Sequence, residues 1–243
     1  MDPDGGILTG YCNATLLSAQ ILVTAAHCVA ESLALSKNQI HIEVGAYKYV
    51  ARKSDGKQVR IGYVPTYKKD LAAHFMLSKE LQRRLASSGP SAQIPPEEDI
   101  ALVFLSEKLE LDSHFIFANV VPQAVWNEVK NHLNTAQFFI TSVNLWENST
   151  NLDSKRVSTV LNQFSYQSGG WLESQSYSRV QEGDSGSPVY MAYRGQTYIA
   201  AVVKGLASNV FANWDVLPAL STKACSVAHD NNLGAEFLHL VCK

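Results

Sequence analysis

The sequence predicts an all-β fold of the barrel or sandwich kind. Short runs of β-branched, aromatic and other apolar residues recur along most of the chain, separated by Gly, Asn, Asp and Pro. Strands do not alternate with helices in the way that a parallel sheet with crossover helices requires. Hydrophobic residues make up 46% and charged residues 17% of the 243 positions, so the chain can bury a substantial core.

The first half of the chain contains most of the shorter runs. The expected strands are 7–8, 14–17, 21–24, 40–44, 59–64 and 100–105. Residues 25–30 close the third run, and we expect them to form a single helical turn.

Residues 68–96 differ from this pattern. Residues 70–86 are rich in Leu, Ala, Lys, Glu and Arg, and their larger apolar residues lie roughly at helical spacing. These are Leu71, Phe75, Leu81 and Leu85. A Ser-Ser-Gly-Pro sequence then ends the pattern. The segment therefore predicts a helical insertion around residues 70–88, between two strands.

The second half returns to β-type runs. Residues 113–134 are mixed in character and are expected to connect two halves. The expected strands are 138–143, 157–164, 188–192 and 198–203. We expect a C-terminal helix at residues 233–240.

Charge and hydrophobicity exclude some classes of partner. The formal net charge is −2, and no basic patch indicates binding to nucleic acid. No run of about 18 apolar residues occurs, so we expect no membrane span. Residues 1–6 lack the basic and apolar regions of a signal peptide.

The four cysteines fall into two groups, Cys12 with Cys28 and Cys225 with Cys242. Two disulfides closing such loops would each contribute roughly 3 kcal/mol and would imply an oxidising compartment. The alternative is four buried thiols in a cytosolic protein. Because no Cys-x-x-Cys occurs and no His lies at metal-ligand spacing, we expect no metal site.

The segment around Ser185 is the first candidate for catalysis. Gly183 and Gly186 flank it, Asp184 precedes it, and an apolar run at 188–192 follows. The glycines permit backbone conformations in which neighbouring amide groups converge on one point, as an oxyanion site requires. The same composition is also that of an ordinary turn.

A serine hydroxyl becomes a good nucleophile only when a base takes its proton and a third group orients that base. His27, which follows the apolar run 21–26, is the candidate base. Asp99, which precedes the apolar run 100–105, is the candidate orienting group.

Three blocks of the sequence resemble the signature blocks of the trypsin/chymotrypsin-like serine proteases, in the same order. They are TAAHC at residues 24–28, DIAL at 99–102 and GDSGSP at 183–188. Cys12 and Cys28 also match the family's bridge beside the histidine. The resemblance implies two six-stranded antiparallel β-barrels with the active site between them.

The resemblance also divides the chain. Residues 1–112 would form the N-terminal barrel, which contains the insertion 68–96. Residues 113–134 would connect it to a C-terminal barrel with a terminal helix, residues 135–243. The insertion would border the cleft and shape substrate access, or it would pack outside the first barrel.

The resemblance assigns a role to each candidate residue. Ser185 would be the nucleophile, His27 the general base and then the acid, and Asp99 the group that orients His27. The amides of Gly183 and Ser185 would form the oxyanion hole. No metal or organic cofactor is implied.

The primary pocket departs from the family pattern. The resemblance would place Arg179 at the floor of this pocket, where it would pair an acidic substrate side chain, or it would instead point to solvent or pair with Glu182. The family's pocket cysteines are missing, and Lys204 replaces the usual Ser. The candidate pocket residues are Arg179, Val180, Glu182, Lys204, Gly205 and Leu206. They do not define a specificity.

Asp184 resembles the acid that, in members activated by cleavage, binds a newly formed amino terminus. The residues before Cys12 contain no Ile-Val-Gly-Gly, so the partner of Asp184 stays open.

These observations favour a secreted or exported serine endopeptidase, monomeric, that cleaves protein or peptide substrates through an acyl-enzyme. Two alternatives stay open. One is a protein-binding homologue that does not cleave, and the other is an esterase that uses the same three residues.

Overall fold

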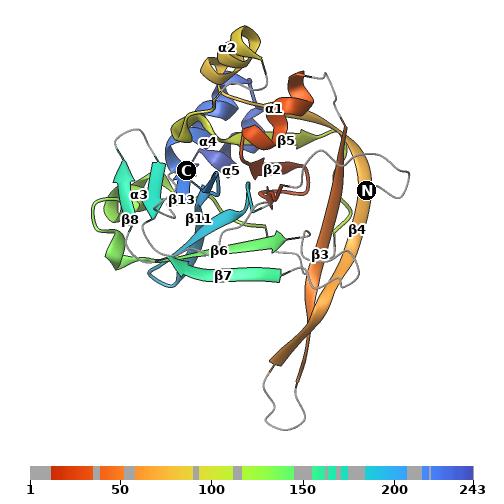
Figure 1. Ribbon diagram of the computed structural model, residues 1–243, viewed down its shortest axis with the longest axis vertical. Helices are drawn as coiled ribbons and strands as arrows, with labels where there is room; N and C mark the ends of the chain where they lie inside the picture. Colours follow the sequence, from red (N-terminus) through yellow and green to blue (C-terminus); the bar gives the residue numbers. More distant parts are fainter. Residues whose placement is uncertain are drawn as a thin grey trace.

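Antiparallel β-sheet dominates the computed structural model (Figure 1). The structure describes residues 12–34, 39–51, 58–89, 93–111, 117–144, 155–161, 164–167, 171–174, 184–206, 215–218 and 220–242. The strand expected at 7–8 lies outside these residues.

The first sheet has five strands in the order β1-β2-β5-β4-β3, all paired antiparallel. They are β1 (Thr15–Leu16), β2 (Ile21–Thr24), β3 (Gln39–Ala51), β4 (Gln58–Met76) and β5 (Ala101–Leu105). The long β3–β4 hairpin extends beyond the rest of the molecule in Figure 1.

Two four-stranded sheets follow in the second half, in the orders β11-β10-β6-β7 and β12-β13-β9-β8. The first contains β6 (Gln137–Asn144), β7 (Lys155–Leu161), β10 (Pro188–Tyr193) and β11 (Gln196–Val202). The second contains β8 (Phe164–Gln167), β9 (Trp171–Ser174), β12 (Gly205–Leu206) and β13 (Asp215–Pro218). The pairings among the described strands leave each sheet open, so the closed six-stranded barrels stay a prediction.

Helices lie at the edges of the sheets and near the C-terminus. They are α1 (His27–Ala34), α2 (Lys79–Ser88), η1 (Pro96–Glu98), α3 (Gln123–Val129), η2 (Leu133–Thr135), α4 (Leu220–Asp230) and α5 (Ala235–Val241). The C-terminal helix agrees with the expected position. In the described part of the chain, no helix is long and apolar enough to cross a membrane.

The prediction of a helix from residue 70 is wrong for residues 70–76, which belong to β4. Leu71 and Phe75 are four positions apart, a spacing that fits a helix and also one face of a strand. Ala73 between them is also buried, whereas Asp70, Ala72 and His74 are exposed. This alternation is that of a strand. The helix starts only after Ser78, whose Oγ accepts a hydrogen bond from the Leu81 amide at 3.1 Å.

Other boundaries also differ. The single turn expected at 25–30 is an eight-residue helix, α1. The run expected as one strand at 157–164 contains the end of one strand and the start of another, β7 and β8. The sequence patterns do not predict helices α3 and α4.

One hydrophobic cluster joins the two halves of the molecule. β2 and β5 are buried on both faces, which explains their nearly continuous apolar sequences. Leu22 and Val103 face a cluster with α1 and α2. The opposite faces meet residues of β11 and the C-terminal helices. The central residues of that shared cluster are Ile21, Val23, Ile100, Leu102, Ile199, Val202, Val227 and Val241.

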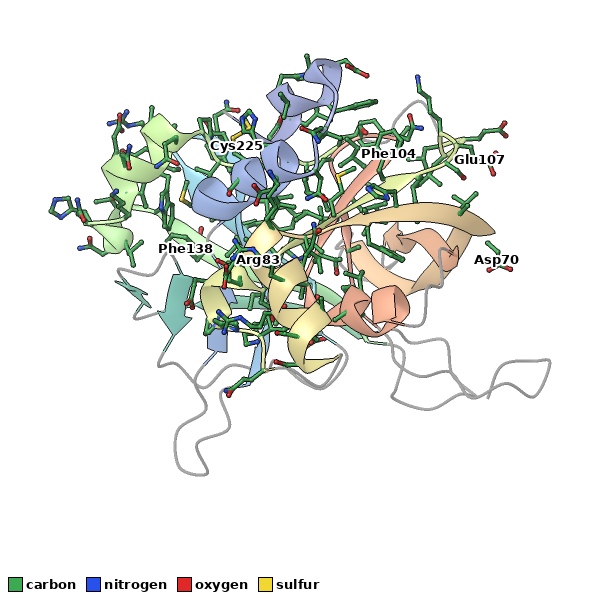
Figure 2. All side chains as sticks on the ribbon, turned by 90° about the horizontal axis from the view of Figure 1, so that it is seen from above. Asp70, Arg83, Phe104, Glu107, Phe138 and Cys225 are labelled. Atoms are coloured by element: carbon green, nitrogen blue, oxygen red, sulfur yellow. A yellow bond between two sulfur atoms is a disulfide. The ribbon has the colours of Figure 1, made fainter. Side chains whose placement is uncertain are left out.

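The C-terminal helices are fastened to this shared cluster. A disulfide joins Cys225 in α4 to Cys242 after α5. Phe104 of β5 packs edge-on against Phe237 of α5, with ring centroids 5.3 Å apart, and Figure 2 shows Phe104 on β5 near these helices. The pair of helices therefore braces the strands that lead to the candidate site.

Candidate active site

His27 and Asp99 meet because β2 and β5 are neighbours. Thr24, the last residue of β2, pairs with Ala101, the first residue of β5. The chain turns at buried Ala25 and Ala26, and α1 begins at His27. Two residues 72 positions apart in sequence are thus brought to the same edge of the sheet.

The carboxylate of Asp99 holds His27 through both its backbone and its ring. The His27 amide donates to Oδ1 at 2.9 Å, and ring Nδ1 lies 2.9 Å from Oδ2 and 3.1 Å from Oδ1. An ionised carboxylate only accepts hydrogen bonds, so Nδ1 carries a proton. In the neutral ring, Nε2 is then the free base. The His27 side chain is 34% exposed, which leaves it open to a reacting group.

Asp99 is completely buried, with 0% of its side chain exposed. Burial by itself raises the pKa of its carboxyl group. The hydrogen bond from the His27 ring, the charges of His27 and Lys204, and the His27 amide outweigh that effect, so the pKa lies below its ordinary value. Asp99 is therefore a carboxylate at neutral pH.

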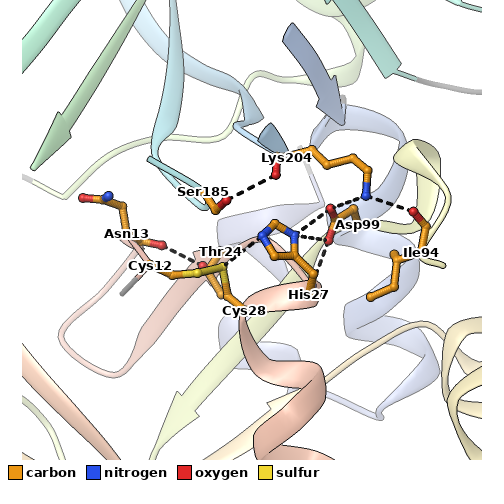
Figure 3. A network of polar contacts seen from close by, with 9 residues as sticks. All are labelled: Cys12, Asn13, Thr24, His27, Cys28, Ile94, Asp99, Ser185 and Lys204. Atoms are coloured by element: carbon orange, nitrogen blue, oxygen red, sulfur yellow. Dashed lines mark hydrogen bonds and ion pairs between the residues drawn. A yellow bond between two sulfur atoms is a disulfide. The ribbon is translucent and has the colours of Figure 1, made fainter. Parts of the chain in front are cut away.

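Lys204 supplies the second cationic contact to Asp99. Its Nζ lies 2.9 Å from Asp99 Oδ2 and donates to the Ile94 carbonyl, also at 2.9 Å. Its side chain is 26% exposed. Although the sequence places Lys204 among the candidate pocket residues, its ammonium lies against the carboxylate that holds His27 (Figure 3).

Ser185 lies in a tight turn pressed against the segment that follows Cys12. Gly186 has a φ of +79°, a conformation that side chains other than glycine rarely adopt. A Cβ at this position would collide with the Asn13 carbonyl oxygen and Thr24 Oγ1. The Asn13 amide donates to the Ser185 carbonyl at 2.7 Å, and Thr24 Oγ1 donates to the Asn13 carbonyl at 2.7 Å. Strand β2 and the serine turn are thereby linked through Asn13.

A disulfide fixes this link beside His27. Cys12, adjacent to Asn13, is bonded to Cys28, adjacent to His27. The bridge thus connects the segment that holds the Ser185 turn to the helix that carries the histidine. It also leaves Cys28 Sγ 3.7 Å from His27 Nε2.

The hydroxyl of Ser185 donates to the carbonyl of Lys204 at 3.2 Å (Figure 3). No hydrogen bond between Ser185 Oγ and His27 Nε2 is present in the described part of the chain. The turn is fixed relative to Lys204 by a reciprocal backbone pair. The Gly186 amide donates to the Val203 carbonyl at 2.8 Å, and the Val203 amide donates to the Ser187 carbonyl at 2.9 Å.

The structure thus brings His27, Asp99, Ser185 and Lys204 together. Asp184 is buried, with 1% exposed. Gly205 and Leu206 form the short strand β12. Gly183, Arg179, Val180 and Glu182 lie outside the described residues, as do the residues before Cys12.

Among the described residues, two groups of side chains lie close enough together to hold a metal ion. They are Cys12, His27 and Cys28, and Cys225, His229 and Cys242. Both cysteine pairs are disulfides, so their sulfurs are not available as the thiolates that bind metals.

Comparison with protein families identifies the class of protein. The family model Trypsin matches residues 5–211. The search of curated proteins returned no match. The chain belongs to the trypsin/chymotrypsin-like serine protease family.

Proposed function

We propose that the protein is a serine endopeptidase in which Ser185, His27 and Asp99 act together. The observation that carries the proposal is the buried Asp99 carboxylate, which accepts from Nδ1 of His27 at 2.9 Å and leaves Nε2 as the base. Membership of the family and the serine turn held beside this pair support the same assignment.

The proposed reaction begins with a rotation of the Ser185 hydroxyl from the Lys204 carbonyl toward His27 Nε2. Catalytic hydrogen bonds of this kind are often absent in a free enzyme and form when substrate binds. As Oγ attacks the carbonyl carbon of the substrate, its proton moves to Nε2. The amides of Gly183 and Ser185 would stabilise the negative oxygen.

Collapse of this intermediate breaks the peptide bond. His27 gives its proton to the departing amine, and the acyl group remains on Ser185 Oγ. Water, deprotonated by Nε2, then attacks the ester and releases the acid, and the proton returns to Oγ. Asp99 orients the ring and stabilises its charged form throughout.

We propose that the protein works outside the reducing cytosol as a monomer acting on protein or peptide substrates. The two disulfides support an oxidising compartment. Arg179 stays the candidate for a residue that binds the substrate side chain in the primary pocket.

Labelling with a fluorophosphonate probe tests the proposal, because the probe reacts with an activated serine. We expect the wild-type chain to be labelled and to cleave protein substrates, and Ser185→Ala to do neither. Removing such a nucleophile typically lowers turnover by about 10⁴ or more. Cleavage of nitrophenyl esters without cleavage of proteins would instead indicate an esterase.

A protein-binding homologue is the second candidate. It is favoured by the hydrogen bond from Ser185 to Lys204, which directs the hydroxyl to a carbonyl and not to His27. A folded chain that the probe does not label, with or without a native N-terminus, would support this candidate and contradict the endopeptidase.

A further inference from the structure

Lys204 places a full positive charge behind the pair formed by Asp99 and His27. The ammonium and the His27 ring both contact Oδ2 of Asp99, each at 2.9 Å. Since the carboxylate is completely buried, its charge interacts with both partners through a medium that screens weakly.

A second contact explains how the lysine side chain stays in place. Nζ donates to the carbonyl of Ile94, a buried residue in the last part of the 68–96 segment. This carbonyl and Asp99 Oδ2 occupy two of the three hydrogens of the ammonium. A flexible side chain held by two acceptors loses much of its freedom to swing toward a substrate.

Acidic residues also stand next to Asp99 and Ser185 in the sequence. Glu98, the residue before Asp99, accepts a hydrogen bond from the hydroxyl of Ser78. Asp184 is buried in the serine turn. Within the described residues, His27 and Lys204 are the charged side chains with a hydrogen bond to Asp99.

We propose that Lys204 is a positioning residue of the active site: held by the Ile94 carbonyl, its ammonium fixes the Asp99 carboxylate and opposes protonation of His27, so that the general base stays available at lower pH. The catalytic part of this inference rests on the proposed function. The electrostatic part does not, because it concerns the ionisation of His27 in the folded chain.

The direction of the effect follows from the charges. An imidazolium would carry a positive charge close to that of Lys204, and like charges disfavour the charged form. Removal of the lysine charge therefore makes protonation of His27 easier and moves the acid limb of the activity profile to higher pH.

Three substitutions separate charge from shape. Lys204→Met removes the charge and keeps a long unbranched side chain. Lys204→Arg keeps the charge. Lys204→Ser introduces the family's usual residue, and it provides a second neutral variant if the methionine variant does not fold. Circular dichroism and thermal unfolding establish that each variant is folded.

The first measurement is an NMR titration of the imidazole resonances, with His27 assigned by comparison with His27→Ala. We expect the midpoint for His27 to lie at higher pH in K204M or K204S than in the wild type and K204R. Equal midpoints in folded wild-type and neutral variants would overturn the proposal, whether or not the chain is an enzyme.

The second measurement is kcat/KM between about pH 5 and 9. We expect K204M to be about tenfold slower than the wild type near pH 6, with the difference narrowing toward pH 9 and with KM little changed. K204R should keep the acid limb of the profile at the same pH as in the wild type. If K204M instead altered the preference for acidic substrate side chains without moving the acid limb, Lys204 would be a pocket residue and the proposal would fail.

Failure of the proposed function gives a different result. A wild-type chain that neither reacts with a fluorophosphonate nor cleaves any substrate refutes the endopeptidase. In that case the NMR midpoints still decide whether Lys204 affects the protonation of His27.

Discussion

At the scale of single residues, the neighbour of Ser185 is as constrained as the serine itself. Gly186 combines a positive φ of 79° with contacts to Asn13 and Thr24 that leave no space for a Cβ. Since Asn13 also binds the Ser185 carbonyl, a shift of either segment moves the hydroxyl relative to His27.

We expect Gly186→Ala to lower the free energy of unfolding by about 2 kcal/mol or more, because it adds a collision to an unfavourable backbone conformation. Fluorophosphonate labelling should slow by at least about tenfold. Chemical denaturation and labelling rates provide the two measurements.

Gly195→Ala is the matched control. Gly195 also has a positive φ, 76°, but nothing lies within 4 Å of the position its Cβ would take. We expect a cost of about 1 kcal/mol and unchanged labelling. Equal losses in the two variants would contradict the role of the Asn13 contact.

The sequence predicts part of this site. Three motif blocks identify His27, Asp99 and Ser185, and the structure brings them together. The contact between Lys204 and Asp99 joins residues 105 positions apart and depends on the path of a flexible side chain. No local pattern reports such a contact. The sequence signals it only through the departure from serine at position 204, which the family pattern assigns to the pocket.

At the scale of elements, α2 is fastened to the end of α4. Leu81, in the first turn of α2, is buried. Asn231 Nδ2 donates to the Leu77 carbonyl at 2.6 Å, and Gln82 Nε2 donates to Asn231 Oδ1 at 3.1 Å. The amide of Lys79 donates to Asp230 at 2.9 Å. The start of α2, which precedes Asp99 in the chain, is thus held by the C-terminal half of the molecule.

We expect Asn231→Ala to lower the free energy of unfolding by about 1 kcal/mol, because it removes one of the two side-chain donors to the carbonyl of buried Leu77; Gln82 Nε2, at 2.8 Å, is the other. Amide hydrogen exchange in residues 79–88 should become faster. Denaturant titration and exchange measured by mass spectrometry test both effects.

Asn127→Ala is the control for this prediction. Asn127 accepts a hydrogen bond from Gln123 on the exposed surface of α3. We expect a change within about 0.5 kcal/mol. If Asn231→Ala changed neither stability nor exchange in α2, the contacts with α4 would be irrelevant to the stability of that helix.

Residues 70–76 show why one element was mispredicted. Their composition favours a helix, but pairing with β5 determines their conformation: Ala73 to Met76 are in register with Leu105 to Leu102. Tertiary packing overrides local propensity here. A deletion of residues 70–90 would remove these pairs, so replacement of 79–88 is the better test of whether α2 shapes substrate access.

At the scale of the whole molecule, stability and ionisation of the site are coupled. The pKa of Asp99 is lower in the folded chain than its ordinary value, although burial opposes this, because His27 and Lys204 stabilise the carboxylate. A lowered pKa contributes stability that is fully present above the unfolded value of about 3.9 and is lost as pH falls through the folded value.

We therefore expect the free energy of unfolding of the wild type to fall more steeply below about pH 4 than that of Asp99→Asn, which lacks this ionisation. Urea titrations from about pH 7 to 3 measure the difference between the two proteins. The difference in free energy of unfolding should shrink as the pH falls below about 4. Parallel curves over the entire range would show that Asp99 is not involved in acid unfolding.

The overall class of the fold was accessible from sequence because short apolar runs and turn residues are local. The arrangement of the halves was not. The shared cluster combines β2 and β5 with β11 and two C-terminal helices. Each contributes a few apolar residues whose partners are distant in the chain, and helix α4 carries Ser, Thr and Cys that weaken its local helical signal.

The hydrogen bond between the Lys204 ammonium and the Ile94 carbonyl also constrains how the sequence can evolve. A lineage that lost Ile94 by shortening the 68–96 segment would remove one hydrogen-bond acceptor of the Lys204 ammonium, which lies beside the buried Asp99 carboxylate. A lineage that first replaced the lysine would leave the Ile94 carbonyl without that donor. We expect each change to be harmful alone and tolerable with the other, so the lysine and the long segment should be inherited as a pair. Relatives with serine at this position should therefore have a shorter segment before the aspartate.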